Sequence, residues 1–262
     1  MELISILLSS LLFIGSPVGV ILDQVAEDAI RDRLVKVEDI DVRVDNASAF
    51  QLLRGKVDKL RIGARGVYPV PDFRIAIADL ETDAIDLDFG QLQRGQVALD
   101  QPLNSALHVV ITPADLNAFL QSPAFTERLN QIPVNLSNPA QSREFSRYRL
   151  TNPQAVFLPN NRLRLSLDLA DQFSAEVLEI EAETGLAIEA GHRLALLDPT
   201  VLVNGEAAPP QLLDTFTRNL GDRLSLRRLE SAGVTLRVLA VSIEPDAFDL
   251  ALWAQIDPSF TR

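Results

Sequence analysis

The side chains best placed to do chemistry are carboxylates that recur at every second residue. They stand at Asp39, Asp41, Asp86, Asp88, Glu179, Glu181 and Glu183. Paired carboxylates can bind a metal ion or transfer a proton. In this sequence the residues between them are apolar, which is typical of a strand with one face in water. The spacing therefore predicts solvated strand faces, and we expect neither a metal site nor an acid–base pair.

Other catalytic groups are scarce. The chain has two histidines, His108 and His192, and neither lies in a spacing that would form a zinc site. It has no cysteine, which rules out a disulfide, a thiolate ligand and a cysteine nucleophile. No serine-nucleophile motif or phosphate-binding glycine loop occurs. We expect no catalytic residue and no cofactor, so the sequence favours a protein that is not an enzyme.

The charge pattern restricts the partners. The formal net charge is −12, which argues against nucleic-acid binding, because Lys and Arg must neutralise phosphates in such complexes. The densest positive run contains Lys59, Arg61 and Arg65. These three residues are candidates for contact with the phosphate of a lipid headgroup or with a membrane surface. The alternative is an ordinary solvated strand face.

Apolar residues at every second position dominate both halves of the chain. This alternation predicts antiparallel strands with one apolar face and one polar face. The apolar faces could enclose a groove for acyl chains, although such faces usually form a core packed by helices. The candidate lining residues are Ile75, Ile77, Ile85, Leu87, Val109, Ile111, Leu163, Leu165, Leu167, Leu178 and Ile180.

Helical patterns interrupt the strands at a few places. Apolar residues follow the helical period in residues 17–36 and 209–224. The segment Thr112-Pro-Ala-Asp115 resembles a capping box with proline in the first turn, and Ser122-Pro123 starts a second short helix. Helices and single strands do not alternate regularly, which argues against a parallel sheet. The predicted fold class is α+β, dominated by long antiparallel strands.

The N-terminal segment differs from the rest, because residues 3–22 carry no charge. Segment 1–22 could be a membrane anchor, an exported leader or an apolar helix packed on the protein itself. We expect residues 23–262 to form a single domain, with a possible loop boundary at the polar stretch 133–146. The segment favours membrane association but does not fix the side of the membrane.

Three segments carry a resemblance to a known family. They are LLRGKVDKLRIGARGV (52–67), LETDAIDLDF (80–89) and LQRGQVALDQPLNSALHVVITPADLNAFLQS (92–122). Together they resemble the LmeA-like phospholipid-binding family, and most of all its cyanobacterial members. The shared features are structural: a glycine turn at Gly55, a strand, and a helix start at Thr112. The resemblance implies phospholipid binding at or near the cell envelope. It also implies a tubular arrangement in which long curved sheets wrap amphipathic helices.

Three functions stay open at this point. The first is non-enzymatic phospholipid binding in an apolar groove, with possible transfer or presentation of the lipid. The second is a structural or adaptor protein of the envelope with the same sheets and a solid core. The third is an accessory factor in glycolipid synthesis.

Overall fold

The computed structural model describes residues 27, 30–31, 34–45, 51, 54–92, 94, 98–131, 147–208, 213 and 225–261. The uncharged segment 1–22 and the expected loop boundary 133–146 lie outside these residues. So does most of the helices expected at 17–36 and 209–224.

The larger sheet has six antiparallel strands in the order β1-β3-β4-β6-β13-β12. They are β1 (Lys36–Asp45), β3 (Lys59–Val70), β4 (Phe73–Thr82), β6 (Leu103–Ile111), β12 (Val234–Glu244) and β13 (Ala247–Ile256). The last hairpin of the chain therefore completes a sheet that the first half began. This return ties the two ends of the described chain into one unit.

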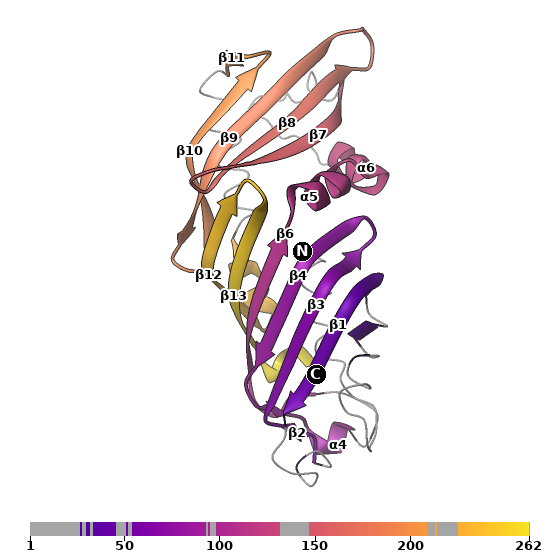
Figure 1. Ribbon diagram of the computed structural model, residues 1–262, viewed down its shortest axis with the longest axis vertical. Coiled ribbons are helices and arrows are strands. Elements are labelled where there is room, and N and C mark those ends of the chain that lie inside the picture. Colours follow the sequence, from indigo (N-terminus) through magenta and orange to yellow (C-terminus); the bar gives the residue numbers. More distant parts are fainter. Residues whose placement is uncertain are drawn as a thin grey trace.

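The second sheet has five antiparallel strands in the order β11-β10-β9-β8-β7. They are β7 (Tyr148–Leu158), β8 (Arg162–Asp171), β9 (Val177–Glu189), β10 (Arg193–Val203) and β11 (Glu206–Ala207). A small ladder joins β2 (Lys56–Val57) to β5 (Ile85–Asp86). The two larger sheets lie end to end in an elongated molecule, as Figure 1 shows.

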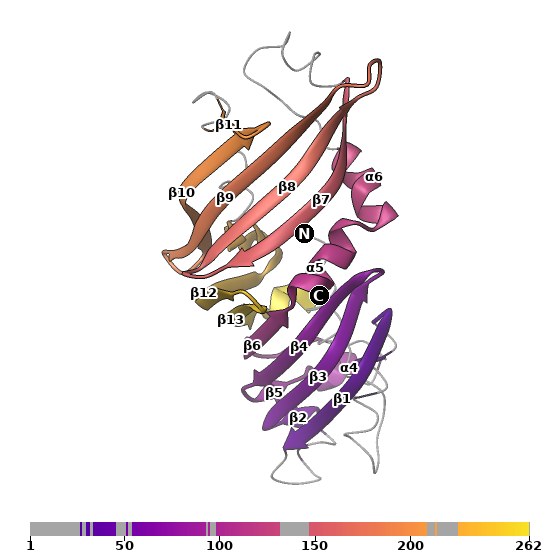
Figure 2. The same cartoon turned by 45° about the horizontal axis from the view of Figure 1, so that its top comes forward.

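The described helices are short. They are α4 (Phe89–Leu92), α5 (Pro113–Leu120), α6 (Pro123–Gln131) and the 3-10 helices η1 (Leu226–Ala232) and η2 (Pro258–Thr261). Helices α5 and α6 lie beside β7 at the edge of the second sheet (Figure 2). The expected start of α5 is confirmed: the Thr112 hydroxyl accepts a hydrogen bond from the Asp115 backbone N–H at 3.2 Å. Gly55 occupies the expected turn, with a φ of 77°.

The expected fold class needs a correction. Long, curved antiparallel strands are confirmed, but the protein is mostly β rather than α+β with sheets wrapped around helices. The helical pattern of α5 and α6 is real. Helix α6, however, lies against the edge strand β7 (Figure 2), and α5 contacts both β7 and β4 of the first sheet. Both large sheets are open in the described residues, because each ends in two edge strands.

The most complete core lies on one face of the first sheet. Its buried residues are Ile30, Ile40, Val42, Leu60, Ile62, Ala64, Val67, Ile75, Leu80 and Val109. Leu60 is 1% exposed and Val42 is 4% exposed. Ile30 and Leu34, from the region where the sequence predicts an amphipathic helix, pack against this cluster. Burial of alternate aliphatic residues is a main source of stability for the first sheet.

Candidate functional site

The second sheet has one apolar face and one polar face. On the apolar face, β8 and β9 form a ladder of opposed pairs, each two residues further from the turn between them. The pairs are Leu169 with Leu178, Leu167 with Ile180, and Leu165 with Ala182. Side chains directly opposite in an antiparallel pair lie on the same face. The structure therefore brings together the predicted liners Leu163, Leu165, Leu167, Leu178 and Ile180.

Most of these ladder residues are only partly covered, whereas Leu169 is buried at 5% exposed. Leu163, Leu165, Leu167, Leu178 and Ile180 are all half-buried, whereas the core of the first sheet is closed. Alternate residues of β10, among them Val201 and Val203, extend the same face and are also half-buried. Part of each of these aliphatic side chains therefore stays accessible on this face.

The predicted liners of the first half are placed differently. Ile75 (2% exposed) and Val109 (8% exposed) lie inside the closed core. Ile85, Leu87 and Ile111 are half-buried and pack against core clusters. Their surroundings are therefore those of ordinary core residues.

Ile77 lies on the opposite face of the first sheet. It stands opposite Arg65 on β3 and Val110 on β6, whereas its neighbour Ala78 stands opposite Ala64 and Val109. Its pairing with Arg65, whose side chain is 48% exposed, puts Ile77 on the outer face, although Ile75, two residues earlier, lies in the closed core.

The apolar faces of the two sheets meet at a third cluster. Buried Phe157 and Leu186 of the second sheet contact buried Ile243 of β12, and Phe248 of β13 packs against them. The ring centroids of Phe157 and Phe248 are 6.4 Å apart. Phe248 stands opposite Ile111, next to the core of the first sheet. One apolar surface therefore continues from the closed core to the partly covered ladder.

Asn161, in the turn between β7 and β8, makes hydrogen bonds across this junction between the two sheets. Its side-chain Oδ1 accepts a hydrogen bond from the Ile243 backbone N–H at 2.6 Å. Its Nδ2 donates to the Val241 carbonyl at 3.3 Å, and its own carbonyl accepts from the Leu186 N–H at 3.0 Å. Asn161 adopts a φ of 59°, a conformation that asparagine tolerates better than most residues. Two side-chain hydrogen bonds of Asn161 thus join the end of the second sheet to β12.

Two asparagines make hydrogen bonds to the backbone of β7, an edge strand of the second sheet. The side-chain amide of Asn117 on α5 donates to the carbonyl of Ala155 and accepts from its N–H, both at 2.8 Å. Asn130 on α6 does the same with Leu150, at 3.0 Å and 2.8 Å. Each amide occupies the place of a neighbouring strand, which protects an edge that could otherwise pair with another chain. The sequence pattern does not predict this role, although both residues are polar positions within predicted helices.

The headgroup candidates lie on the outer face of the first sheet, away from its closed core. Each of them is paired with a carboxylate of a neighbouring strand. The Lys59 Nζ is 2.6 Å from Glu81, and Arg61 is 2.5 Å from Asp45. Hydrogen bonds first from Lys59 and then from Arg61 hold the pKa of Glu81 below its ordinary value. A lipid phosphate at this place would have to compete with these carboxylates.

A further outer-face group makes stability depend on pH. The His108 ring Nε2 is 3.0 Å from Asp249, and its Nδ1 is 3.6 Å from Asp79. The hydrogen bond to Asp249 is the largest cause that raises the pKa of His108 above its ordinary value of 6.5. A raised folded-state pKa means that this stabilisation is fully present below the unfolded-state pKa. It is then lost as the pH rises through the folded-state pKa.

We expect the variant His108→Gln to lose this contribution. Thermal unfolding of the parent should show a decrease in melting temperature from about pH 6.5 upward that the variant shows less strongly. Lipid uptake should be unchanged, because His108 faces away from the apolar ladder. Identical pH profiles for the two proteins would contradict the assignment.

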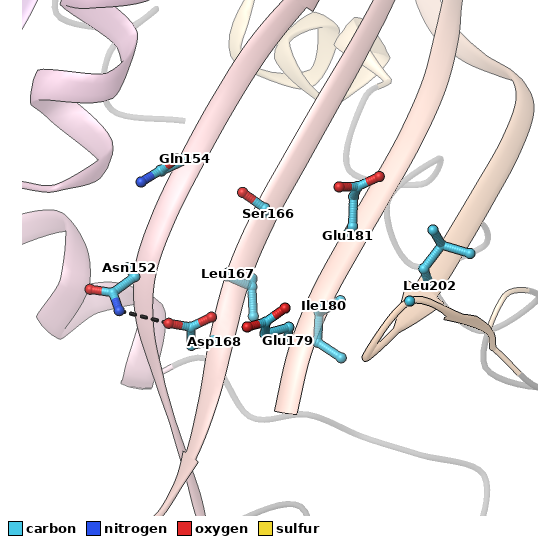
Figure 3. A pocket seen from close by; sticks show the side chains of 10 residues that line it. Asn152, Gln154, Ser166, Leu167, Asp168, Glu179, Ile180, Glu181 and Leu202 are labelled. Atoms are coloured by element: carbon cyan, nitrogen blue, oxygen red, sulfur yellow. Dashed lines mark hydrogen bonds between the residues drawn. The ribbon is translucent and has the colours of Figure 1, made fainter. Parts of the chain in front are cut away.

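The polar face of the second sheet carries a hollow of about 390 Å³. Its lining includes Asp168, Glu179 and Glu181, and the ladder residues Leu167 and Ile180 border it (Figure 3). Asn152 donates a hydrogen bond to Asp168 at 2.6 Å. Among the described residues no group of three or more potential ligands is arranged to hold a metal ion. The hollow is open and acidic, so it does not resemble a site for an acyl chain.

The described chain is a mostly β protein with two open antiparallel sheets and one partly covered aliphatic face. The family model for LmeA-like phospholipid-binding proteins matches residues 16–252, and the chain belongs to that family. The family is defined by phospholipid binding and is not a known enzyme family. No curated protein and no solved structure matches the chain. The predicted likeness to cyanobacterial members stays a prediction.

Membership of this family indicates contact with lipid membranes. In the part of the chain that the structure describes, no helix is long and apolar enough to cross a bilayer. Location at the cell envelope and the side of the membrane stay predictions.

Proposed function

We propose that the protein holds a phospholipid by laying an acyl chain along the apolar ladder of β8 and β9, without catalysing a reaction. The observation that carries this proposal is the row of half-buried aliphatic pairs that joins the closed core at the Phe157–Phe248 contact. Family membership supports phospholipid as the ligand.

The ladder has a suitable length for this ligand. From Leu163 to Leu169, β8 advances six residues, which is about 20 Å at about 3.3 Å per residue. One acyl chain extends through half of a hydrocarbon core about 30 Å thick, or about 15 Å. The apolar strip is therefore long enough to cover one chain.

The energetics are favourable. Each buried methylene contributes about 0.8 kcal/mol, so a dozen methylenes on the strip would contribute about 10 kcal/mol before the entropic cost of binding. An aliphatic surface provides this contact without any hydrogen bond to the chain. The site should therefore discriminate weakly among acyl chains and more strongly among headgroups.

Transfer and presentation of the lipid at the envelope are part of the proposal. Contact of a headgroup phosphate with Lys59, Arg61 or Arg65 would place the lipid on the first sheet instead, apart from the ladder (Figure 1). A phosphate at these cations would have to displace Glu81, Asp45 or Asp79. The closed core around Ile75 and Val109 favours the alternative of a structural or adaptor protein for the first sheet. An accessory role in glycolipid synthesis would use the same lipid-holding face.

Native mass spectrometry of the full chain purified from cells, followed by lipid extraction, tests the proposal. We expect a stoichiometric phospholipid to co-purify with the protein. A protein that is empty, and that also takes up no lipid from phosphatidylcholine vesicles, would instead support the structural alternative.

A further inference from the structure

The turn between β8 and β9, residues 171–177, exposes two large apolar side chains within five residues. Phe173 is 83% exposed and Val177 is 49% exposed. The other exposed large apolar residues among the described ones are Val35, Phe89, Val156, Leu197 and Leu239, and each is 60% exposed or less. Isolated apolar residues on a surface are common, but a close pair at the tip of a hairpin indicates a contact site.

An ion pair and two hydrogen bonds order the backbone of this tip. The Asp171 side chain is fully buried and is paired with Arg147. The same carboxylate accepts a hydrogen bond from the Phe173 N–H at 2.8 Å. The Asp171 N–H donates to the Glu176 carbonyl at 3.0 Å, which closes the turn. Phe173 is therefore presented by an ordered turn, so its exposure is a feature of the fold.

The tip is continuous with the apolar ladder. The opposed pair next to the turn, Ala170 with Val177, lies on the polar face, and the following pair, Leu169 with Leu178, begins the ladder. A lipid that reaches the tip therefore meets the row of aliphatic side chains that leads to the Phe157–Phe248 junction. The tip also lies at the far end of the elongated molecule from α4, as Figure 1 shows.

The charges of the tip restrict its partner. Within residues 171–177 the charged side chains are Asp171, which Arg147 neutralises, and Glu176. The chain as a whole carries a net charge of −12. Attraction to an anionic surface is therefore not available at this place, and apolar insertion is the driving force that remains. A bilayer interface with zwitterionic headgroups fits this chemistry.

We propose that the β8–β9 tip is the part of the protein that inserts into a zwitterionic phospholipid interface, with Phe173 as the inserted side chain. This inference rests on the proposed function, because the tip would be the place where a lipid reaches the apolar ladder. It predicts that docking is insensitive to salt and separable from lipid holding.

Site-specific fluorescence of the full chain tests the insertion. The single tryptophan is removed by Trp253→Phe, and an indole is then introduced by Phe173→Trp or, as the matched control at the opposite end, by Phe89→Trp. With vesicles of brominated phosphatidylcholine, we expect a blue shift and quenching for the indole at position 173 and neither for that at position 89. Raising the salt concentration from about 0.05 M to about 0.5 M should not reduce the quenching. A local readout is needed because segment 1–22 could itself bind membrane.

Three results would overturn the insertion. The first is equal quenching at the two positions. The second is quenching that needs phosphatidylglycerol and disappears in salt, which would indicate electrostatic docking. The third is a blue shift at position 173 without vesicles together with a dimer in light scattering, which would show that a second copy covers the tip.

The variant Phe173→Ser separates docking from holding. Burial of a phenylalanine side chain changes partition by about 10- to 100-fold, so transfer of phospholipid from vesicles should slow by about this factor. Uptake of a dispersed short-chain phosphatidylcholine should be unchanged, and Phe89→Ser should change neither property. Normal transfer by Phe173→Ser would refute the tip and leave the ladder intact. Failure of the parent protein to bind any phospholipid would instead refute the proposed function.

Discussion

Replacing Leu165 by glutamate is expected to abolish phospholipid uptake. Leu165 lies at the middle of the ladder, opposite Ala182 and between Leu163 and Leu167 on the same face. A carboxylate there could not be hydrated once an acyl chain covered it, and such desolvation costs several kcal/mol. Because 1.4 kcal/mol is a tenfold change in affinity, we expect a decrease of at least about 100-fold. Uptake of fluorescent phosphatidylcholine by the purified protein measures this change.

A matched control lies on the other face of the same sheet. Val156 on β7 is 45% exposed and stands opposite Arg164, so Val156→Glu makes a comparable substitution next to a cation. This variant should take up lipid normally. The thermal unfolding of both variants shows whether each is folded. If folded Leu165→Glu protein took up lipid as well as Val156→Glu protein, the acyl chain would not lie on this ladder.

The second large effect is expected from Asn161→Ala, and it is an effect on stability. The substitution removes the acceptor of the Ile243 N–H, and Ile243 is 0% exposed. An unsatisfied buried donor costs about 1–3 kcal/mol, and alanine at a positive φ adds about 1–2 kcal/mol. We therefore expect the free energy of unfolding to fall by about 2–5 kcal/mol in urea denaturation.

The neighbouring residue gives the control for this variant. Asn160 has a φ of 63° in the same turn but is exposed. Asn160→Ala should therefore show only the backbone part of the loss, about 1–2 kcal/mol. Equal losses in the two variants would mean that the hydrogen bonds between Asn161 and β12 contribute nothing to stability.

Much of the fold follows from the sequence because long alternation is a strong signal. The alternation predicted for β8 and β9 is present in the structure, which places Leu165, Leu167 and Ile180 on one face. The start of α5 was predicted from the types of Thr112 and Asp115, since capping is a local interaction. Features that depend on residues close together in the chain could therefore be predicted from the sequence.

Strand β4 shows where the sequence pattern became ambiguous. Its segment FRIAIADLET has apolar residues at both parities: Ile75 and Ile77 on one, Ala78 and Leu80 on the other. Pairing with β3 decides the face of each residue, and it puts Ile77 on the outer side with Arg65. Which strand pairs with β4, and in which register, is not encoded in the period of β4 itself.

The features that the sequence did not predict are contacts between segments far apart in the chain. The carboxylates that pair with Lys59, Arg61 and Arg65 come from other strands, so a cationic run in sequence became a neutralised surface. The edge contacts of Asn117 and Asn130 depend on how α5 and α6 lie against β7. The α+β part of the prediction is corrected to a mostly β fold, because the helices among the described residues are short.

Photo-crosslinking can show whether the bound acyl chain lies on the apolar ladder. A phosphatidylcholine with a diazirine on its acyl chain is bound to the full chain and activated, and the adducts are located by peptide mass spectrometry. We expect adducts on the apolar face of β8 and β9, at residues such as Leu165, Leu167 and Ile180. Adducts confined to the outer face of the first sheet, around Lys59 and Arg61, would contradict this expectation.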